Sequence, residues 1–149
     1  MDAVVERIRE RLYAEGHRYT GPRDAVIRAL AAAEGPVNAD ALADEVRARR
    51  VDRSSVYRTL GLLVELGLAR RVEFAEGAAR FELAEPFIDH HHHLVCTVCG
   101  RIDELPGCDL ESIHRIVSRR SGYSIEAHRL DFFGTCPTCR RGAGGVKKA

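Results

Sequence analysis

The chain is 149 residues long, carries a formal net charge of +1 and is 45% hydrophobic. This length accommodates one domain or two small ones, and the balanced charge gives no sign of a nucleic-acid partner. The absence of a run of about 18 apolar residues excludes a membrane-spanning helix. The charged N-terminus has no apolar signal-peptide core, so we expect a cytoplasmic protein with five reduced cysteines.

The first 67 residues are predicted to be helical. Apolar residues at helical spacing predict a helix over 2–15, and Gly16 is placed to end it. Polar residues suited to N-caps precede three further helices: Thr20 for the second, Asn38 or Asp40 for the third, and Asp52, Ser54 or Ser55 for the fourth. Gly67 is expected to end the fourth helix.

Two short alternating runs, 68–74 and 79–83, flank Glu76-Gly77 and predict a β-hairpin. Helices followed by a two-stranded hairpin have the order of a winged helix-turn-helix, in which the last helix enters the major groove of DNA. The alternative is a small helical domain with an incidental hairpin.

The second half is predicted to be a small α/β unit, so that the whole chain has the α+β fold class. Alternating residues predict strands over 91–96, 101–105 and 124–133. A helix is expected over 109–121, with its apolar face at Leu110, Ile113, Ile116 and Val117.

Two Cys-x-x-Cys pairs, Cys96/Cys99 and Cys136/Cys139, predict a four-thiolate metal site. Four thiolates suit tetrahedral Zn²⁺, and a site with four protein ligands has no open position for catalysis. The alternative is a redox-active set of thiols. Cys108 has no such partner and is interpreted as a small buried residue, with a reactive thiol or spare ligand as the lesser alternative.

Four consecutive histidines, residues 90–93, run directly into the strand that carries Cys96. Because side chains alternate along a strand, His91 and His93 would face one way and His90 and His92 the other. Partner ligands would come from elsewhere in the chain: Glu82, Asp103, Glu104, Glu111 and His128. Mixed histidine and carboxylate ligands suit Fe²⁺, Mn²⁺ or Zn²⁺. The alternative is a solvated histidine stretch; His17 and His114 are interpreted as ordinary residues.

Four motifs together resemble the ferric-uptake-regulator (Fur) family of bacterial transcription factors, from about residue 5 to residue 141. They are Arg18-Tyr19-Thr20-x-x-Arg23, Ser55-Val56-Tyr57-Arg58-Thr59-Leu60, the segment 90–99, and His128-Arg129-Leu130-x-x-x-Gly134-x-Cys136. The resemblance implies a homodimeric repressor, not an enzyme, in which bound metal closes two DNA-binding domains on palindromic operator DNA. It implies neither a membrane nor a small-molecule substrate.

The resemblance also implies domain boundaries and residue roles. A winged-helix domain would span 1–84, a hinge 85–90, and a dimerisation and metal-binding domain 91–141. The small and polar composition of 142–149 itself predicts a disordered tail. DNA contacts would come from Tyr57, Arg58, Ser55 and Thr59 on the recognition helix and from Arg23 at the backbone. A regulatory site at the hinge would use Glu82, His91, His93 and Glu104, and an additional site would use His90, His92, Glu111 and His128.

Two departures from the family pattern concern Pro36, where a further histidine ligand is frequent, and Thr20-Gly21-Pro22-Arg23, where Thr-Pro-Gln-Arg is usual. Beside structural Zn²⁺, we expect Fe²⁺ as the regulatory ion, with control of metal-uptake genes. Zinc-responsive, then manganese- or peroxide-responsive regulation, are the alternatives. Two alternatives come from other protein classes: a metal-dependent hydrolase or deaminase, and a metal buffer without DNA binding.

Overall fold

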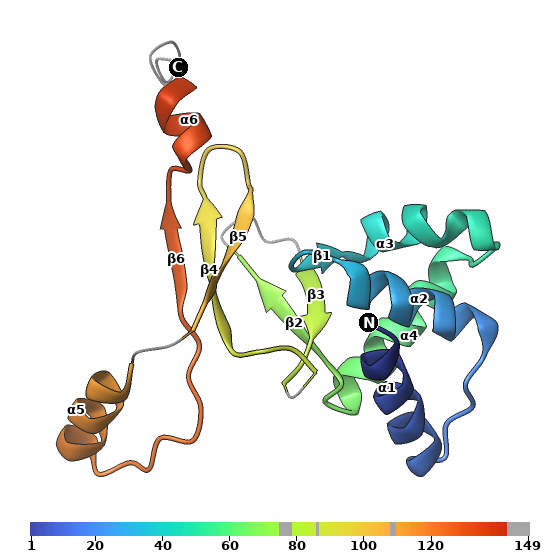
Figure 1. The fold of residues 1–149 in the computed structure, drawn as a ribbon, viewed down its shortest axis with the longest axis horizontal. Coiled ribbons are helices and arrows are strands. Elements are labelled where there is room, and N and C mark those ends of the chain that lie inside the picture. The colour runs from blue at the N-terminus through green and yellow to red at the C-terminus, as the bar shows by residue number, and fades with distance from the viewer. Residues whose placement is uncertain (75–78, 86, 108–109, 143–149) are drawn as a thin grey trace. The chain divides into compact units, whose positions relative to one another are not determined.

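The computed structural model describes residues 1–74, 79–85, 87–107 and 110–142, which fall into two compact units, Met1–Ile88 and Asp89–Ala149. Figure 1 shows their elements. The expected hairpin turn at Glu76-Gly77, Cys108 and the tail from residue 143 onward lie outside the described residues. No helix in the described part of the chain is long and apolar enough to cross a membrane.

Four α-helices begin the first unit: α1 (Asp2–Ala14), α2 (Gly21–Ala32), α3 (Ala39–Val46) and α4 (Arg53–Glu65), with a short 3₁₀ turn, η1 (Arg47–Arg49), between the last two. Local chemistry sets their starts, because the side chains of Thr20, Asn38 and Asp52 accept backbone N–H bonds at the first turns of α2, α3 and α4. Of the alternative caps, Asn38 and Asp52 are therefore the ones used. Gly16 and Gly67 follow α1 and α4 with φ of +76° and +67°, as helix ends favour.

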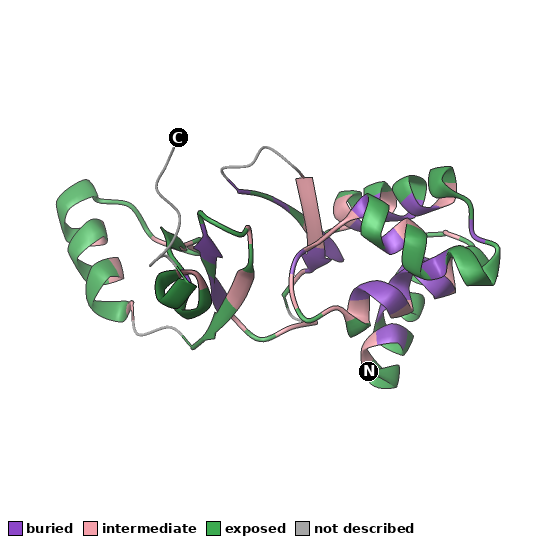
Figure 2. Ribbon diagram, turned by 90° about the horizontal axis from the view of Figure 1, so that it is seen from above, coloured by how far each residue is buried: buried purple, intermediate pink, exposed green. Residues whose placement is uncertain are grey.

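The apolar faces of these four helices meet in one core. Ile8, Leu12, Ile27, Leu42 and Leu60 are fully buried side chains of this core. Each of these helices has a buried side, which the purple ribbon segments of the first unit show (Figure 2). Phe87 and Ile88 pack against the same core, so the first unit remains packed up to its last residue, Ile88.

A three-stranded sheet completes the first unit, with strand order β1-β3-β2. The strands β2 (Ala69–Glu73) and β3 (Ala79–Leu83) form the expected antiparallel hairpin. The two-residue strand β1 (Val37–Asn38) pairs with β3 and was not predicted, because two residues carry no periodicity. Helices followed by this hairpin confirm the winged helix-turn-helix.

The second unit is built on a sheet in the order β5-β4-β6, so that β4 (His91–Cys96) lies in the centre. The strand β5 (Ile102–Pro106) is antiparallel to it and β6 (Asp131–Gly134) is parallel. The expected strand over 124–133 was too long: β6 pairs with β4 only from His93 to Cys96, and a strand extends only as far as its ladder.

Two helices flank β6 in the sequence. The helix α5 (Glu111–Ser121) has no buried residue, and Ile113, Ile116 and Val117 are 50%, 50% and 42% exposed. The helix α6 (Pro137–Gly142) begins directly after Cys136 with a proline, which suits the first position of a helix. Gly142, expected to begin the tail, is the last residue of α6.

Candidate metal centres and DNA-binding helix

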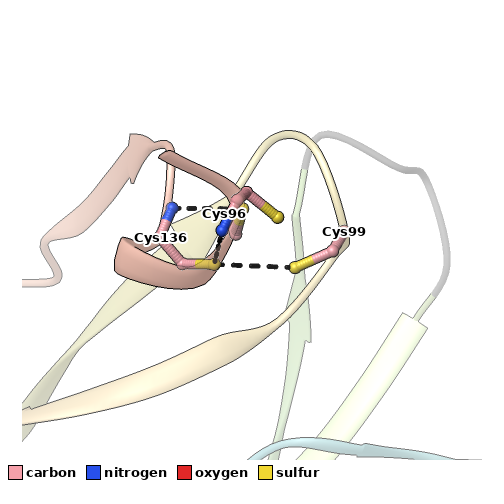
Figure 3. Close-up of side chains that lie close together, drawn as sticks. Cys96, Cys99 and Cys136 are labelled. Carbon is pink, nitrogen blue, oxygen red and sulfur yellow. Dashed lines mark hydrogen bonds between the residues drawn. The ribbon is translucent and has the colours of Figure 1, made fainter. Parts of the chain in front are cut away.

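The four cysteines of the two Cys-x-x-Cys pairs come together in the second unit. Cys96 ends β4, and Cys99 lies in the turn that follows. Cys136 directly precedes α6, and Cys139 lies in the first turn of α6. Their four sulfur atoms all lie within 4.8 Å of one another. The sulfurs of Cys99 and Cys136 point toward each other across 3.9 Å (Figure 3). A tetrahedral zinc ion with bonds of about 2.3 Å requires sulfurs about 3.8 Å apart, so the four thiols could hold zinc.

Backbone hydrogen bonds favour the ionised form of one of these thiols, that of Cys96. Backbone N–H groups, first that of Cys136 at 3.3 Å and then that of Cys99, donate to the Cys96 sulfur and lower its pKa to about 6. Hydrogen bonds with the sulfurs of Cys99 and Cys136 raise the pKa of Cys139 to about 12. A metal ion bound among the four sulfurs would displace the remaining thiol protons and balance the charge of the thiolates.

The strand β4 presents histidines on both of its faces, as the alternation predicts. On the first face, the rings of His91 and His93 lie 5.0 Å apart between centroids. His93 stands opposite Glu104 of β5 in the strand register, and His91 Nε2 lies 4.0 Å from Glu104 Oε1. The structure therefore brings these three expected ligands of the regulatory site to one face of the sheet.

Asp131 joins this face and was missed in the sequence. It stands opposite His93 in the parallel pairing of β4 with β6, and its Oδ1 lies 3.0 Å from His93 Nδ1. His91 Nδ1 lies 2.8 Å from the carbonyl oxygen of Asp89. A ligating histidine usually bonds a carboxylate or carbonyl through one ring nitrogen and the ion through the other. In both histidines Nδ1 has such a partner, so Nε2 is the nitrogen that would be left for an ion.

The opposite face gathers a second histidine group. Ligand atoms of His90, His92 and His128 lie within 4.8 Å of one another, and His90 Nε2 is 3.0 Å from His128 Nε2. Glu111, the expected fourth ligand, lies outside this group. Its place near the group is taken by His114, whose Nε2 lies 2.9 Å from His128 Nδ1. His114 stands one helical turn after Glu111, and that i, i+3 spacing was the signal in the sequence.

His92 is the member of the second histidine group with an unsatisfied ring nitrogen. It is 4% exposed, and its Nε2 is the one buried side-chain nitrogen or oxygen without a hydrogen-bond partner among the described residues. Burial, followed by the charges of His90 and His128, lowers the pKa of His92, so the neutral, metal-ligating form is favoured. An unpaired buried polar atom costs free energy that coordination to an ion would offset.

Glu82, the remaining expected ligand of the regulatory site, belongs to β3 in the first unit. Its side chain is 5% exposed and accepts a 2.5 Å bond from Nε of Arg70, whose side chain is 31% exposed. The two residues stand directly opposite each other in the β2–β3 register. The guanidinium thus supplies a cation to a carboxylate that is out of contact with water.

The helix α4 carries the expected DNA-contacting residues. Tyr57 is 50% exposed, and its hydroxyl donates to Asp40 Oδ1 on α3 at 2.8 Å, which holds the ring at the surface. Arg58 is exposed and bonds Ser55 Oγ at 3.2 Å. Ser55 is engaged locally, because its N–H and Oγ both bond the capping carboxylate of Asp52.

The other two expected DNA contacts, Thr59 and Arg23, differ in how far their side chains are buried. Thr59 is only 3% exposed. It follows Arg58 on the buried side of α4, so in this conformation it cannot offer its side chain to DNA, against the expectation. Arg23 is half-buried in the first turn of α2 and donates through its guanidinium to the carbonyl oxygen of Arg18.

Residues 14–133 match the model of the Ferric uptake regulator family. The chain belongs to this family. A ferric uptake regulation protein of Bacillus subtilis (strain 168) is 34% identical over 143 residues, which cover 93% of this chain and 96% of the relative. The ferric uptake regulator Fur of Helicobacter pylori superimposes with a TM-score of 0.80 at 23% identity, covering 93% of each chain. A zinc uptake regulator complexed with zinc and DNA superimposes with a TM-score of 0.63 at 21% identity, covering 97% of each chain.

Proteins of the Ferric uptake regulator family are metal-binding, DNA-binding transcription regulators and not enzymes. Membership of this family identifies the chain as a regulator and removes the hydrolase or deaminase alternative. The winged helix-turn-helix and the metal-ligand clusters agree with such a protein.

Proposed function

We propose that this chain is a homodimeric repressor that binds palindromic operator DNA when a regulatory metal ion is bound, and that the ion is Fe²⁺. The observation that carries the proposal is the alternation along β4. Within four consecutive residues it directs His91 and His93 to one face and His90 and His92 to the other, beside a four-thiolate cluster. A structural metal together with a further imidazole and carboxylate set is suited to sensing an ion that exchanges.

The regulatory site would consist of Glu82, His91, His93 and Glu104, and structural Zn²⁺ would be held by Cys96, Cys99, Cys136 and Cys139. The ion supplies positive charge and a fixed coordination geometry. Imidazole and carboxylate ligands suit Fe²⁺, Mn²⁺ and Zn²⁺. Ligands from both the winged-helix part (1–84) and the part after the hinge (85–90) would restrict the angle between the two domains. That angle sets the half-site spacing a dimer can bind.

DNA contact would come from Tyr57 and Arg58 on α4 and from Arg23 near the phosphate backbone. The Tyr57 ring can pack against thymine methyl groups, and Arg58 can bond guanine bidentately or clamp a phosphate. Both residues are exposed, which supports this role. By linkage, operator DNA must raise the affinity for the regulatory ion by the same factor as the ion raises affinity for DNA.

A second copy of the chain would cover the exposed apolar side chains of the second unit. Ile113, Ile116 and Val117 of α5 are at least 42% exposed, and Phe132 and Phe133 of β6 are 44% and 51% exposed. Apolar surface of this extent is costly in water, and a homodimer through residues 91–141 would bury it.

Zinc-responsive regulation is the second candidate. It is favoured by the similarity to the zinc uptake regulator complexed with zinc and DNA. Against it, the described ligands of the regulatory face are imidazoles and carboxylates, with no thiolate beside them. The B. subtilis relative, named for ferric uptake regulation, supports iron.

One experiment tests the ion and the site together. Protein with zinc at the thiolate site and no other metal is titrated with operator DNA at buffered free Fe²⁺, Zn²⁺ and Mn²⁺. Among the three ions, we expect Fe²⁺ to be the one that activates DNA binding at a free-ion concentration that occurs in cells. The His91→Ala/His93→Ala variant should remain folded and dimeric but lose this response. A normal metal response of that variant would contradict the assigned site, and activation by Zn²⁺ alone would favour the second candidate.

A further inference from the structure

His114 bonds the side of His128 that faces away from the second histidine group. His128 Nδ1 lies 2.9 Å from His114 Nε2, whereas His128 Nε2 lies 3.0 Å from His90 Nε2. The two nitrogens of one imidazole thus have different neighbours: α5 on one side and the strand histidines on the other. Rings of His114 and His128 meet edge to face with centroids 4.7 Å apart.

We propose that His114 is a positioning residue for a metal ion bound by His90, His92 and His128. His114 Nε2 accepts the Nδ1–H of His128 and so directs the Nε2 lone pair of His128 toward the ion. The inference rests on the proposed metal-sensing function, because it assigns a supporting residue to the additional site.

The tautomer of His128 is what His114 controls. Neutral imidazole carries one proton, which in His128 can sit on Nδ1 or Nε2. With the proton on Nε2, the ring can only donate to His90 and offers no lone pair to an ion. An acceptor at Nδ1 holds the proton there and leaves Nε2 as a ligand. Ligating histidines usually have such an outer partner, and its removal costs about 10- to 100-fold in metal affinity.

The composition of the group indicates the class of ion. Its ligand atoms are three imidazole nitrogens within 4.8 Å, and Glu111 lies outside the group. Nitrogen ligands favour Zn²⁺, Co²⁺ or Ni²⁺ over Mg²⁺ or Mn²⁺, which prefer oxygen. His92 Nε2, buried without a hydrogen-bond partner, is a second and independent sign of an ion in this position.

The test is a Co²⁺ titration of zinc-loaded protein in the His91→Ala/His93→Ala background, followed by the d–d absorption of the bound ion. In this background, and with zinc on the four cysteines, the group of His90, His92 and His128 is the remaining metal-ligand group among the described residues. We expect His114→Ala to weaken Co²⁺ binding about 10- to 100-fold. His114→Gln, whose side-chain carbonyl can accept the same proton, should restore most of the affinity. Arg115→Ala, at the next, exposed position of α5, is the matched control and should have no effect.

A second measurement avoids the altered background. Two-bond ¹H–¹⁵N spectra of the parent protein should place the proton of His128 on Nδ1, and His114→Ala should shift His128 toward a mixture of tautomers. A purely structural role of His114 would not produce this change.

The outcomes separate the inference from the proposed function. Unchanged Co²⁺ affinity in His114→Ala would overturn the role of His114. If His92→Ala also bound Co²⁺ like its parent, no ion would occupy this group, and the inference would fail with it. Failure of the proposed function would appear separately, as metal-independent DNA binding by otherwise unaltered protein.

Discussion

Arg70 and Glu82 occupy directly opposed positions of the β2–β3 hairpin and form an ion pair of 2.5 Å between Nε and Oε1. The pair involves a proposed ligand of the regulatory ion, so metal and guanidinium compete for the same carboxylate. If Glu82 binds the regulatory ion as proposed, Arg70 would take part in the regulatory response, because it would have to yield some of its contact with Glu82 when the ion binds.

Replacing Arg70 with Gln should therefore tighten binding of the regulatory ion. Removal of the competing cation is expected to lower the dissociation constant about tenfold, equivalent to about 1.4 kcal/mol. The metal-free protein should become less stable at the same time, because a buried carboxylate loses its counter-ion. Competition titration with a chelator of known affinity measures the first effect, and thermal unfolding measures the second.

Arg71→Gln is the matched control, since it removes the same charge from the next position of the same strand. Arg71 pairs with Glu73, and both side chains are more than half exposed. An equal gain in metal affinity for the two variants would mean that net charge, and not the contact with Glu82, is responsible.

Removal of the structural metal should unfold the second unit selectively. In the described part of the second unit, Val95 is the only buried residue that is neither a histidine nor a cysteine. The second unit therefore has little apolar core. A small core depends on a metal for its folding free energy. We expect Cys99→Ser or Cys136→Ser to abolish zinc retention, measured by metal analysis, and to collapse the amide spectrum of the second unit.

The helical first unit provides the internal control for this experiment. Its core, from Val5 to Leu83, contains no zinc ligand. Its amide resonances should remain dispersed in both cysteine variants, and their loss would contradict an independent core.

Asp52 should contribute an acid-sensitive part of the stability of α4. The hydroxyls of Ser54 and Ser55, followed by the backbone N–H of Ser55, donate to its carboxylate and hold the pKa of Asp52 well below its usual range. The contribution is therefore complete above the unfolded pKa of about 4 and is lost as the pH falls below it. Asp52→Asn keeps a good cap, so it should match the parent near pH 7 and lose less stability on acidification.

Denaturant midpoints of the parent and Asp52→Asn between pH 7 and pH 3 measure this difference. Asp52→Ala, which removes cap and charge together, should be less stable than both at pH 7. Parallel pH profiles for the parent and Asp52→Asn would argue against an ionised cap.

Arg58 and Thr59 should differ in their effects on DNA binding, although they are adjacent. Arg58 is exposed and Thr59 is 3% exposed. Arg58→Ala should cost about 1–3 kcal/mol of operator affinity and reduce specificity if it reads a base, or reduce the salt dependence if it contacts a phosphate. Thr59→Val, similar in volume, should leave operator affinity nearly unchanged in fluorescence anisotropy titrations at two salt concentrations.

Much of the fold was predictable because its signals are local. The caps at Thr20, Asn38 and Asp52 and the stops at Gly16 and Gly67 depend on residues within one helical turn. The strand β1 and the true length of β6 were missed, since both depend on pairing with strands far away in the sequence.

The sequence by itself determined the two thiolate pairs and the division of four histidines between two faces, because metal-ligand spacing and the two-residue period of a strand are properties of a short segment. Only the tertiary structure decided which distant residues join them. The parallel register of β6 on β4 brings Asp131 to His93, and the position of α5 brings His114, rather than Glu111, to His128. The antiparallel register of the hairpin likewise sets Arg70 against Glu82. Such contacts follow from strand register and helix docking, which depend on packing across the whole unit and leave no periodic mark in the sequence.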